Sequence, residues 1–271
     1  MPSQQRDEVI MMSHPANALV MIHGLLGPLD FFDPHTLLPG IDVHAPDLPN
    51  YRSQPPHRWG HGDALALKRH AEWIADYIRS HIDRPICLLG HSVGGAIAML
   101  TASLAPDLVR MVINVEGNFT LNDAFWCRRI ASLSDDAWEA EYRAMQASPA
   151  AWLESGRIEV TGQRLKWAQE ILHNQSAATV LAMARAVVRD TGAPEYLAAV
   201  KKVVAKGIPV HLVAGERSRD GWDVPPWVRS AAASSVVLPS LGHMMMLEAP
   251  VPFCAAIGDI VATAETSPHP P

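Results

Sequence analysis

The chain has 271 residues, of which 48% are hydrophobic and 18% are charged, a composition typical of a globular protein and not of a disordered one. Its 22 basic and 28 acidic residues give a net charge of −6, so a nucleic-acid binder, which usually carries a basic face, is not expected. No apolar run reaches the roughly 18 residues of a membrane span, and the polar start of the chain lacks the apolar segment of a signal peptide. We therefore expect no partnership with nucleic acid or with a membrane.

The cysteines indicate the compartment. Cys87, Cys127 and Cys254 are too few for a disulfide framework and too scattered for a zinc cluster. Free thiols are typical of reducing compartments. The sequence therefore predicts a cytoplasmic protein with reduced cysteines and no metal site.

Short apolar runs alternate with longer helical patterns along the chain. The runs predicted to form strands lie at residues 19–22, 41–45, 85–90, 109–115, 208–215 and 234–239, with a further edge strand predicted at 7–12. Because these runs are almost continuously apolar, they predict parallel strands that are covered on both faces. Helical periodicity between them predicts helices at 64–82 and 93–105. The expected fold class is α/β, with a mostly parallel open sheet flanked by helices on both faces.

One long interval breaks this alternation. About 90 residues between the strands predicted at 109–115 and 208–215 contain no convincing strand. Helices are predicted there at residues 134–147, 164–173 and 176–190. Ser134 is the candidate N-cap of the first, and Gly192 is placed to end the third. We interpret residues 117–206 as a helical lid on a core made of residues 1–116 and 207–265, followed by a disordered tail at 266–271.

The strongest chemical signal is the segment Gly90-His91-Ser92-Val93-Gly94-Gly95, between a predicted strand and a predicted helix. A serine on so sharp a turn takes a strained backbone conformation, and glycines are needed on both sides to avoid clashes. The turn exposes the Ser92 hydroxyl at the carboxyl end of the sheet. It also aims the Val93 N–H at the same point, where it is a candidate oxyanion donor.

Two further segments follow predicted strands. His23-Gly24-Leu25-Leu26-Gly27 is a glycine-rich turn that presents the Leu25 N–H as a second oxyanion donor, and His23 is expected to orient that loop. Leu241-Gly242-His243 follows the last strand. A serine hydroxyl needs a base within hydrogen-bond reach, and the pKa of histidine suits this role, so His243 is the predicted base.

These segments, in this order, resemble those of the α/β-hydrolase fold superfamily over about residues 7–262, and the ending from His243 to Glu248 and Pro250 is also similar to that of the family. The resemblance implies a serine hydrolase with a helical lid inserted after the sixth strand. It implies Ser92 as nucleophile, His243 as base, an acid and an oxyanion hole, with no metal or organic cofactor. It leaves the substrate open, because this fold hosts many chemistries.

The position of the acid departs from the family's pattern. In most relatives the acid follows the strand here written IPVHLVAG, but Ser218 stands at that place. Some members carry the acid after the preceding strand, where this chain has Glu116, a carboxylate that would be costly to bury without a partner. We predict Glu116 as the acid that orients His243, with Asp220, or Asp223 in a shifted loop, as the alternative.

Aromatic and sulfur-containing side chains near Glu116 predict an apolar, adaptable pocket. We assign substrate contacts to His23, Phe119, Trp126 and Met244, while burial of the lid against the sheet is the alternative role for these side chains. The predicted partner is a small molecule, and the sequence sets no oligomeric state.

The predicted function is hydrolysis of an ester, lactone or thioester of a small apolar molecule through an acyl-enzyme. One alternative is a carbon–carbon bond hydrolase, or a cofactor-free oxygenase or lyase, in which His243 is the base and Ser92 only positions the substrate. Another is a ligand-binding receptor of hydrolase ancestry.

Overall fold

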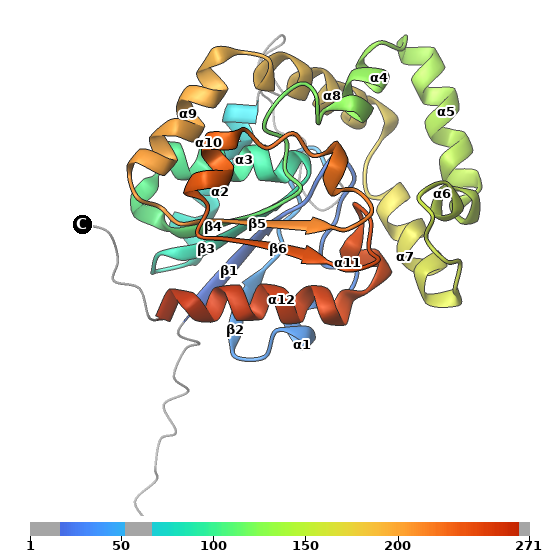
Figure 1. Ribbon diagram of the computed structural model, residues 1–271. Helices are drawn as coiled ribbons and strands as arrows, with labels where there is room; N and C mark the ends of the chain where they lie inside the picture. Colours follow the sequence, from blue (N-terminus) through green and yellow to red (C-terminus); the bar gives the residue numbers. More distant parts are fainter. Residues whose placement is uncertain (1–16, 52–66, 266–271) are drawn as a thin grey trace, which may run out of the picture.

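A computed structural model describes residues 17–51 and 67–265 of the chain. Its centre is a parallel sheet of six strands in the order β2-β1-β3-β4-β5-β6 (Figure 1). The strands are β1 (Asn17–Ile22), β2 (Ile41–His44), β3 (Ile86–His91), β4 (Val109–Val115), β5 (Val210–Gly215) and β6 (Ser234–Leu238). The predicted α/β fold class is confirmed, while the edge strand predicted at 7–12 and the tail at 266–271 lie outside the described residues.

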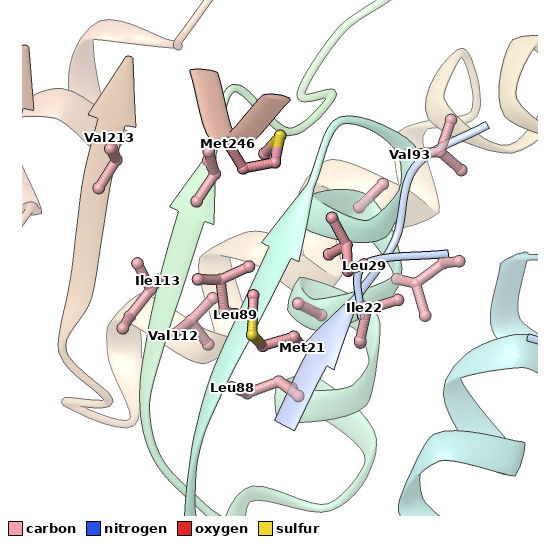
Figure 2. Packing of buried hydrophobic residues seen from close by; sticks show 14 of the residues in the cluster. Met21, Ile22, Leu29, Leu88, Leu89, Val93, Val112, Ile113, Val213 and Met246 are labelled. Carbon is pink, nitrogen blue, oxygen red and sulfur yellow. The ribbon is translucent and has the colours of Figure 1, made fainter. Parts of the chain in front are cut away.

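Continuous burial explains why the strand runs read as apolar. Every residue of β1, β3 and β5 is buried, whereas β6 is only partly buried, as expected for a strand at the edge of the sheet. The register places Leu89 of β3 between Met21 of β1 and Ile113 of β4. Figure 2 shows side chains of these neighbouring strands packed together in the core.

Helices cover both faces of the sheet. On one face α3 (Val93–Leu104) packs on β1, β3 and β4, with α2 (Leu67–His81) beside it. The first three residues of the helix predicted at 64–82 lie outside the described residues, and the buried positions of α2 recur at helical spacing, which is why the pattern was readable. On the other face α12 (Pro250–Ala262) crosses the sheet next to α1 (Pro34–Leu37) (Figure 1).

The interval between β4 and β5 is helical, as predicted. Its helices are α4 (Phe125–Ala131), α5 (Asp135–Ala147), α6 (Pro149–Ser155), α7 (Gly162–His173), α8 (Ala177–Thr191) and α9 (Pro194–Ala205). Ser134 caps α5 by accepting from Ala137 N at 3.2 Å, and Ser176 caps α8 by accepting from Thr179 N at 3.1 Å. Helices α4 and α5 pack on α8, whereas α9 packs on α3 of the core.

Loops at the carboxyl ends of the strands bring distant segments together, because all six strands point the same way. The turn after β1 carries Leu25, Ser92 follows β3, and Glu116 follows β4. His243 lies between β6 and α11 (Met245–Glu248), and α10 (Pro226–Ala231) connects β5 to β6. In the described part of the chain, no helix combines the length and the apolarity needed to cross a bilayer.

Candidate active site

Ser92 occupies a strained turn between β3 and α3, with φ 55° and ψ −123°. Its N–H donates to Val115 O at 3.0 Å, which fixes the turn to the end of β4. A Cβ on Gly90 would lie 2.2 Å from Gly94 O, and a Cβ on Gly94 would lie 2.2 Å from Ile22 O, so any larger residue would displace backbone. The two glycines therefore let α3 begin directly behind the serine, as the sequence predicted.

His243 is held in place from two sides. Glu248 accepts from the N–H of Gly242 at 2.8 Å and pairs with Arg217, which fixes the loop before His243. His91 donates from Nε2 to the carbonyl of His243 at 2.9 Å, and the two rings lie 4.6 Å apart. Burial, together with the nearby charge of His243, lowers the pKa of His91 to about 3, so His91 is neutral at physiological pH.

Glu116 faces His243. His243 Nδ1 donates to Glu116 Oε2 at 2.7 Å, while Oε1 accepts from Gly215 N at 2.8 Å and from Ser218 Oγ at 2.6 Å. The side chain is 3% exposed. Burial alone would raise the pKa of Glu116, but the hydrogen bonds and the charge of His243 outweigh burial and hold that pKa below its ordinary value. The carboxylate is therefore charged at neutral pH, which favours the His243 tautomer that carries its proton on Nδ1.

The structure brings Glu116 to His243, and it does not bring the alternative acid there. The side chain of Asp220 is 95% exposed and pairs with Arg219 at 3.6 Å. Asp223 accepts from Thr120 Oγ1 at 2.6 Å and from Asn122, so it fastens the start of the helical insertion. Ser218, at the place where most relatives carry the acid, contributes a hydroxyl to Glu116 instead.

The loop that carries Leu25 is fixed by buried polar side chains. His23 is neutral in its setting, because burial lowers its pKa, and its Nε2 accepts from Leu48 N at 3.0 Å. Tyr51 donates to Leu25 O at 3.0 Å. From the helical insertion, Gln175 accepts from Gly27 N at 3.1 Å. The insertion thus contacts the loop that is predicted to supply an oxyanion donor.

A cavity of about 590 Å³ opens at this edge of the sheet and is lined by Ser92, Glu116 and His243. Its apolar walls include Leu25, Leu26, Phe125, Trp126, Trp152 and Met244. Of the predicted substrate contacts, Trp126 and Met244 are among these residues, whereas His23 and Phe119 do not line the cavity within the described chain. Phe119 is fully buried and stacks against Trp222, and His23 is 1% exposed and donates from Nδ1 to Gly24 O at 2.8 Å.

Ser92 and His243 line the same cavity but are not joined by a hydrogen bond: within residues 17–51 and 67–265, the Ser92 hydroxyl has no hydrogen-bond partner. Such contacts in ligand-free enzymes are often long and tighten only when substrate binds. Val93 is the first residue of α3, where N–H groups have no partner inside the helix, so its N–H is available to a ligand beside Ser92.

A parallel α/β sheet that carries a serine on a strained turn, with a histidine and a carboxylate paired at the same cavity, defines the class of α/β proteins with a nucleophile elbow. The model of the alpha/beta hydrolase family matches residues 19–256. The chain therefore belongs to the α/β-hydrolase family.

Individual relatives agree with this assignment. A pimeloyl-[acyl-carrier protein] methyl ester esterase of Neisseria meningitidis serogroup C is 35% identical over 104 residues, a stretch that spans 36% of each chain and so about a third of that relative. An N-acyl homoserine lactonase solved with N-hexanoyl homoserine superposes with a TM-score of 0.67 at 19% identity, over 93% of this chain and 91% of that one. A thermophilic esterase from Thermogutta terrifontis, solved with malate, superposes with a TM-score of 0.67 at 16% identity, over 92% of this chain and 90% of that one.

Sequence reasoning missed three contributors to the site. In the sequence Ser218 stands only as the residue that replaces the usual acid, and its hydrogen bond to Glu116 was not predicted. A hydroxyl at that place is the signal that could have indicated a carboxylate partner. Gln175 lies in a turn whose packing against the Leu25 loop leaves no mark on periodicity. In the sequence His91 is only a member of the turn around Ser92, and no pattern indicates its bond to the His243 carbonyl.

Proposed function

We propose that the protein hydrolyses a carboxylic ester, lactone or thioester of a small, largely apolar molecule. Ser92 Oγ attacks the carbonyl carbon while His243 Nε2 takes its proton, and the Leu25 and Val93 N–H groups bind the developing oxyanion. The tetrahedral intermediate then collapses, and the leaving alcohol or thiol takes the proton from His243. Water, activated by the same histidine, releases the acid from Ser92.

The observation that carries this proposal is the pairing of His243 Nδ1 with Glu116 Oε2 at 2.7 Å in the cavity that also exposes Ser92. A charged carboxylate on Nδ1 leaves Nε2 as the lone-pair nitrogen, which is the nitrogen a serine needs as base. The Trp126, Trp152 and Met244 side chains support an apolar acyl or alkyl group. The esterase and lactonase names of the similar proteins agree with the same reaction class.

The test is covalent labelling combined with turnover. Wild-type protein should hydrolyse short p-nitrophenyl esters and should react once per chain with a fluorophosphonate, with the label mapping to Ser92. Ser92→Ala should lose both properties. Ser155→Ala is the matched control, because Ser155 lines the same cavity but its hydroxyl donates to Trp152 O at 2.7 Å; it should still be labelled at Ser92.

Equal ester turnover by wild type and Ser92→Ala would refute the acyl-enzyme. If Ser92→Ala kept substantial activity on other substrates while His243→Ala did not, the reaction in which His243 acts directly as base on the substrate would replace this proposal.

A further inference from the structure

A polar corner interrupts the apolar wall of the cavity next to Ser92. It is formed by Asn118 and Asp123, which both line the cavity and both belong to the connection between β4 and α4. Asn118 is 5% exposed. Its backbone is fixed on both sides, because its N–H donates to Ser92 O at 3.3 Å and its carbonyl accepts from the Tyr196 hydroxyl at 2.6 Å. The side chain is thus held at a defined place beside the predicted nucleophile.

The orientation of the Asn118 amide is set by Asp123. Asn118 Nδ2 donates to the backbone oxygen of Asp123 at 3.2 Å and to its Oδ1 at 3.1 Å. Asn118 Oδ1 therefore points away from the two acceptor oxygens of Asp123, and it is buried with no hydrogen-bond partner in the part of the chain that the structure describes. Buried side-chain oxygens nearly always have a partner, so an unsatisfied one in a binding cavity calls for an explanation.

The second acceptor in the corner is already occupied. Asp123 Oδ2 accepts from Phe119 N at 2.9 Å, and Thr120 N lies 3.4 Å from both carboxylate oxygens. The carboxylate therefore serves the loop, while its charge makes the corner unfavourable for an anionic group. An amide whose N–H donates to a carboxylate is polarised, which makes its oxygen a better acceptor. Among the described residues, the corner consequently holds one buried acceptor without a partner, Asn118 Oδ1.

We propose that Asn118 Oδ1 accepts a hydrogen bond from an N–H or O–H group of the substrate, so that the preferred substrates are esters, lactones or thioesters with an uncharged amide or hydroxyl donor close to the scissile carbonyl. This inference rests on the proposed function of the same cavity. Asn118 is a substrate-binding and specificity-determining residue in this view. A site built to hydrogen-bond a polar group rejects analogues that lack the group, because its own buried atom is then left without a partner.

Matched substrates test the inference. The first two pairs are p-nitrophenyl pentanoate against its 2-hydroxy and its 3-hydroxy analogues. The third pair is α-acetamido-γ-butyrolactone against its N-methyl derivative, which lacks the N–H. We expect wild-type protein to prefer the donor-bearing member of at least one pair by about tenfold or more in kcat/KM, a preference equivalent to about 1.4 kcal/mol.

Variants assign the preference to Asn118. Asn118→Leu should reduce the preference to about one while retaining measurable turnover of the unsubstituted ester. Asn122→Leu is the matched control, since Asn122 lies in the same connection and its side chain donates to Asp223 at 2.9 Å; it should keep the wild-type preference. Damage to the loop lowers kcat/KM for both substrates of a pair together, so the ratio of the two kcat/KM values reports the hydrogen bond and not the state of the loop.

Two results would overturn the inference: no preference for a donor in any pair with wild-type protein, or an unchanged preference in Asn118→Leu. The first result is measured on wild-type protein alone, so it tests the inference even if Asn118→Leu does not fold. Failure of the proposed function is distinguishable, because it removes turnover of the unsubstituted ester by wild-type protein or leaves that turnover intact in Ser92→Ala.

Discussion

Replacing Glu116 by glutamine should reverse the tautomer of His243 without changing the shape of the site. Gly215 N donates to Glu116 Oε1 at 2.8 Å, and an N–H cannot accept, so the amide oxygen of the new glutamine must take the place of Oε1. Its NH₂ group then faces His243 Nδ1, where Glu116 Oε2 now lies at 2.7 Å. Nδ1 must accept instead of donating, which moves the proton to Nε2.

A histidine that carries its proton on Nε2 cannot take the proton of Ser92. In the well-studied triad, the corresponding loss of the acid lowers turnover by about 10⁴, which is about 5.5 kcal/mol of activation free energy at about 1.4 kcal/mol per tenfold. We expect Glu116→Gln to lower kcat on p-nitrophenyl butyrate by about this factor, with little change in KM. Asp220→Asn is the control and should stay within about twofold of wild type, because the Asp220 side chain is 95% exposed and pairs with Arg219.

The neighbouring serine provides a rescue experiment. Ser218 Oγ lies 2.6 Å from Glu116 Oε1, so an aspartate at position 218 would place a carboxylate in the space that Glu116→Ala vacates. We expect Ser218→Asp to recover at least about tenfold of the activity lost in Glu116→Ala. If Glu116→Gln kept more than a tenth of wild-type kcat while Asp220→Asn fell by orders of magnitude, the assignment of the acid would be refuted.

Three further outcomes follow from the geometry. Gln175→Leu should lower kcat about tenfold with little effect on KM in steady-state assays, because the N–H of Gly27 in the Leu25 loop loses its acceptor. Gly94→Ala should reduce the free energy of unfolding, measured in urea, by about 3 kcal/mol, because the new Cβ would lie 2.2 Å from a β1 carbonyl oxygen. Gly162→Ala is the control and should change this free energy by less than about 0.5 kcal/mol, because a Cβ there has nothing within 4 Å. The pKa of His91 is lowered from 6.5 to about 3 on folding, so the unfolded chain binds more protons than the folded one, and the free energy of unfolding falls as the pH drops below 6.5. Urea titration at pH 7 and pH 5 should show that this decrease is about 2 kcal/mol smaller in His91→Gln.

Features of the fold and the site that depend on neighbouring residues could be predicted from the sequence. The turn at Ser92 was predictable because its tight backbone leaves no room for a Cβ at Gly90 or Gly94, so the requirement for glycine is visible in the local sequence. The starts of α5 and α8 were predictable because Ser134 and Ser176 accept from backbone N–H groups three residues further on. Continuous apolar runs predicted the inner strands because β1, β3 and β5 are buried along their whole length.

Contacts between remote segments were harder to predict. Phe119 was expected at the cavity because it follows Glu116 closely, but its ring turns inward and stacks on Trp222, a residue about a hundred positions away in the chain. The seven-residue helices α4 and α6 carry too few turns to produce a clear period. Helix α9 has 12 residues and was missed although its buried residues Tyr196, Val200 and Val203 lie at helical spacing. The link from Gln175 to Gly27 joins positions 148 residues apart, and no local pattern encodes such a contact.

Glu116 and Asn118 lie in the same short connection that leads from β4 into the inserted helices. A chimaera that exchanged those helices with a junction at residue 117 would therefore import a foreign side chain at 118 and discard the Asn118–Asp123 contact, even though the exchanged segment looks like a self-contained module. Grafting that respects the chemistry needs its upstream junction beyond Asp123. In this protein, the connection that carries Glu116 and Asn118 has to stay with the core, and only the helices beyond it can be exchanged.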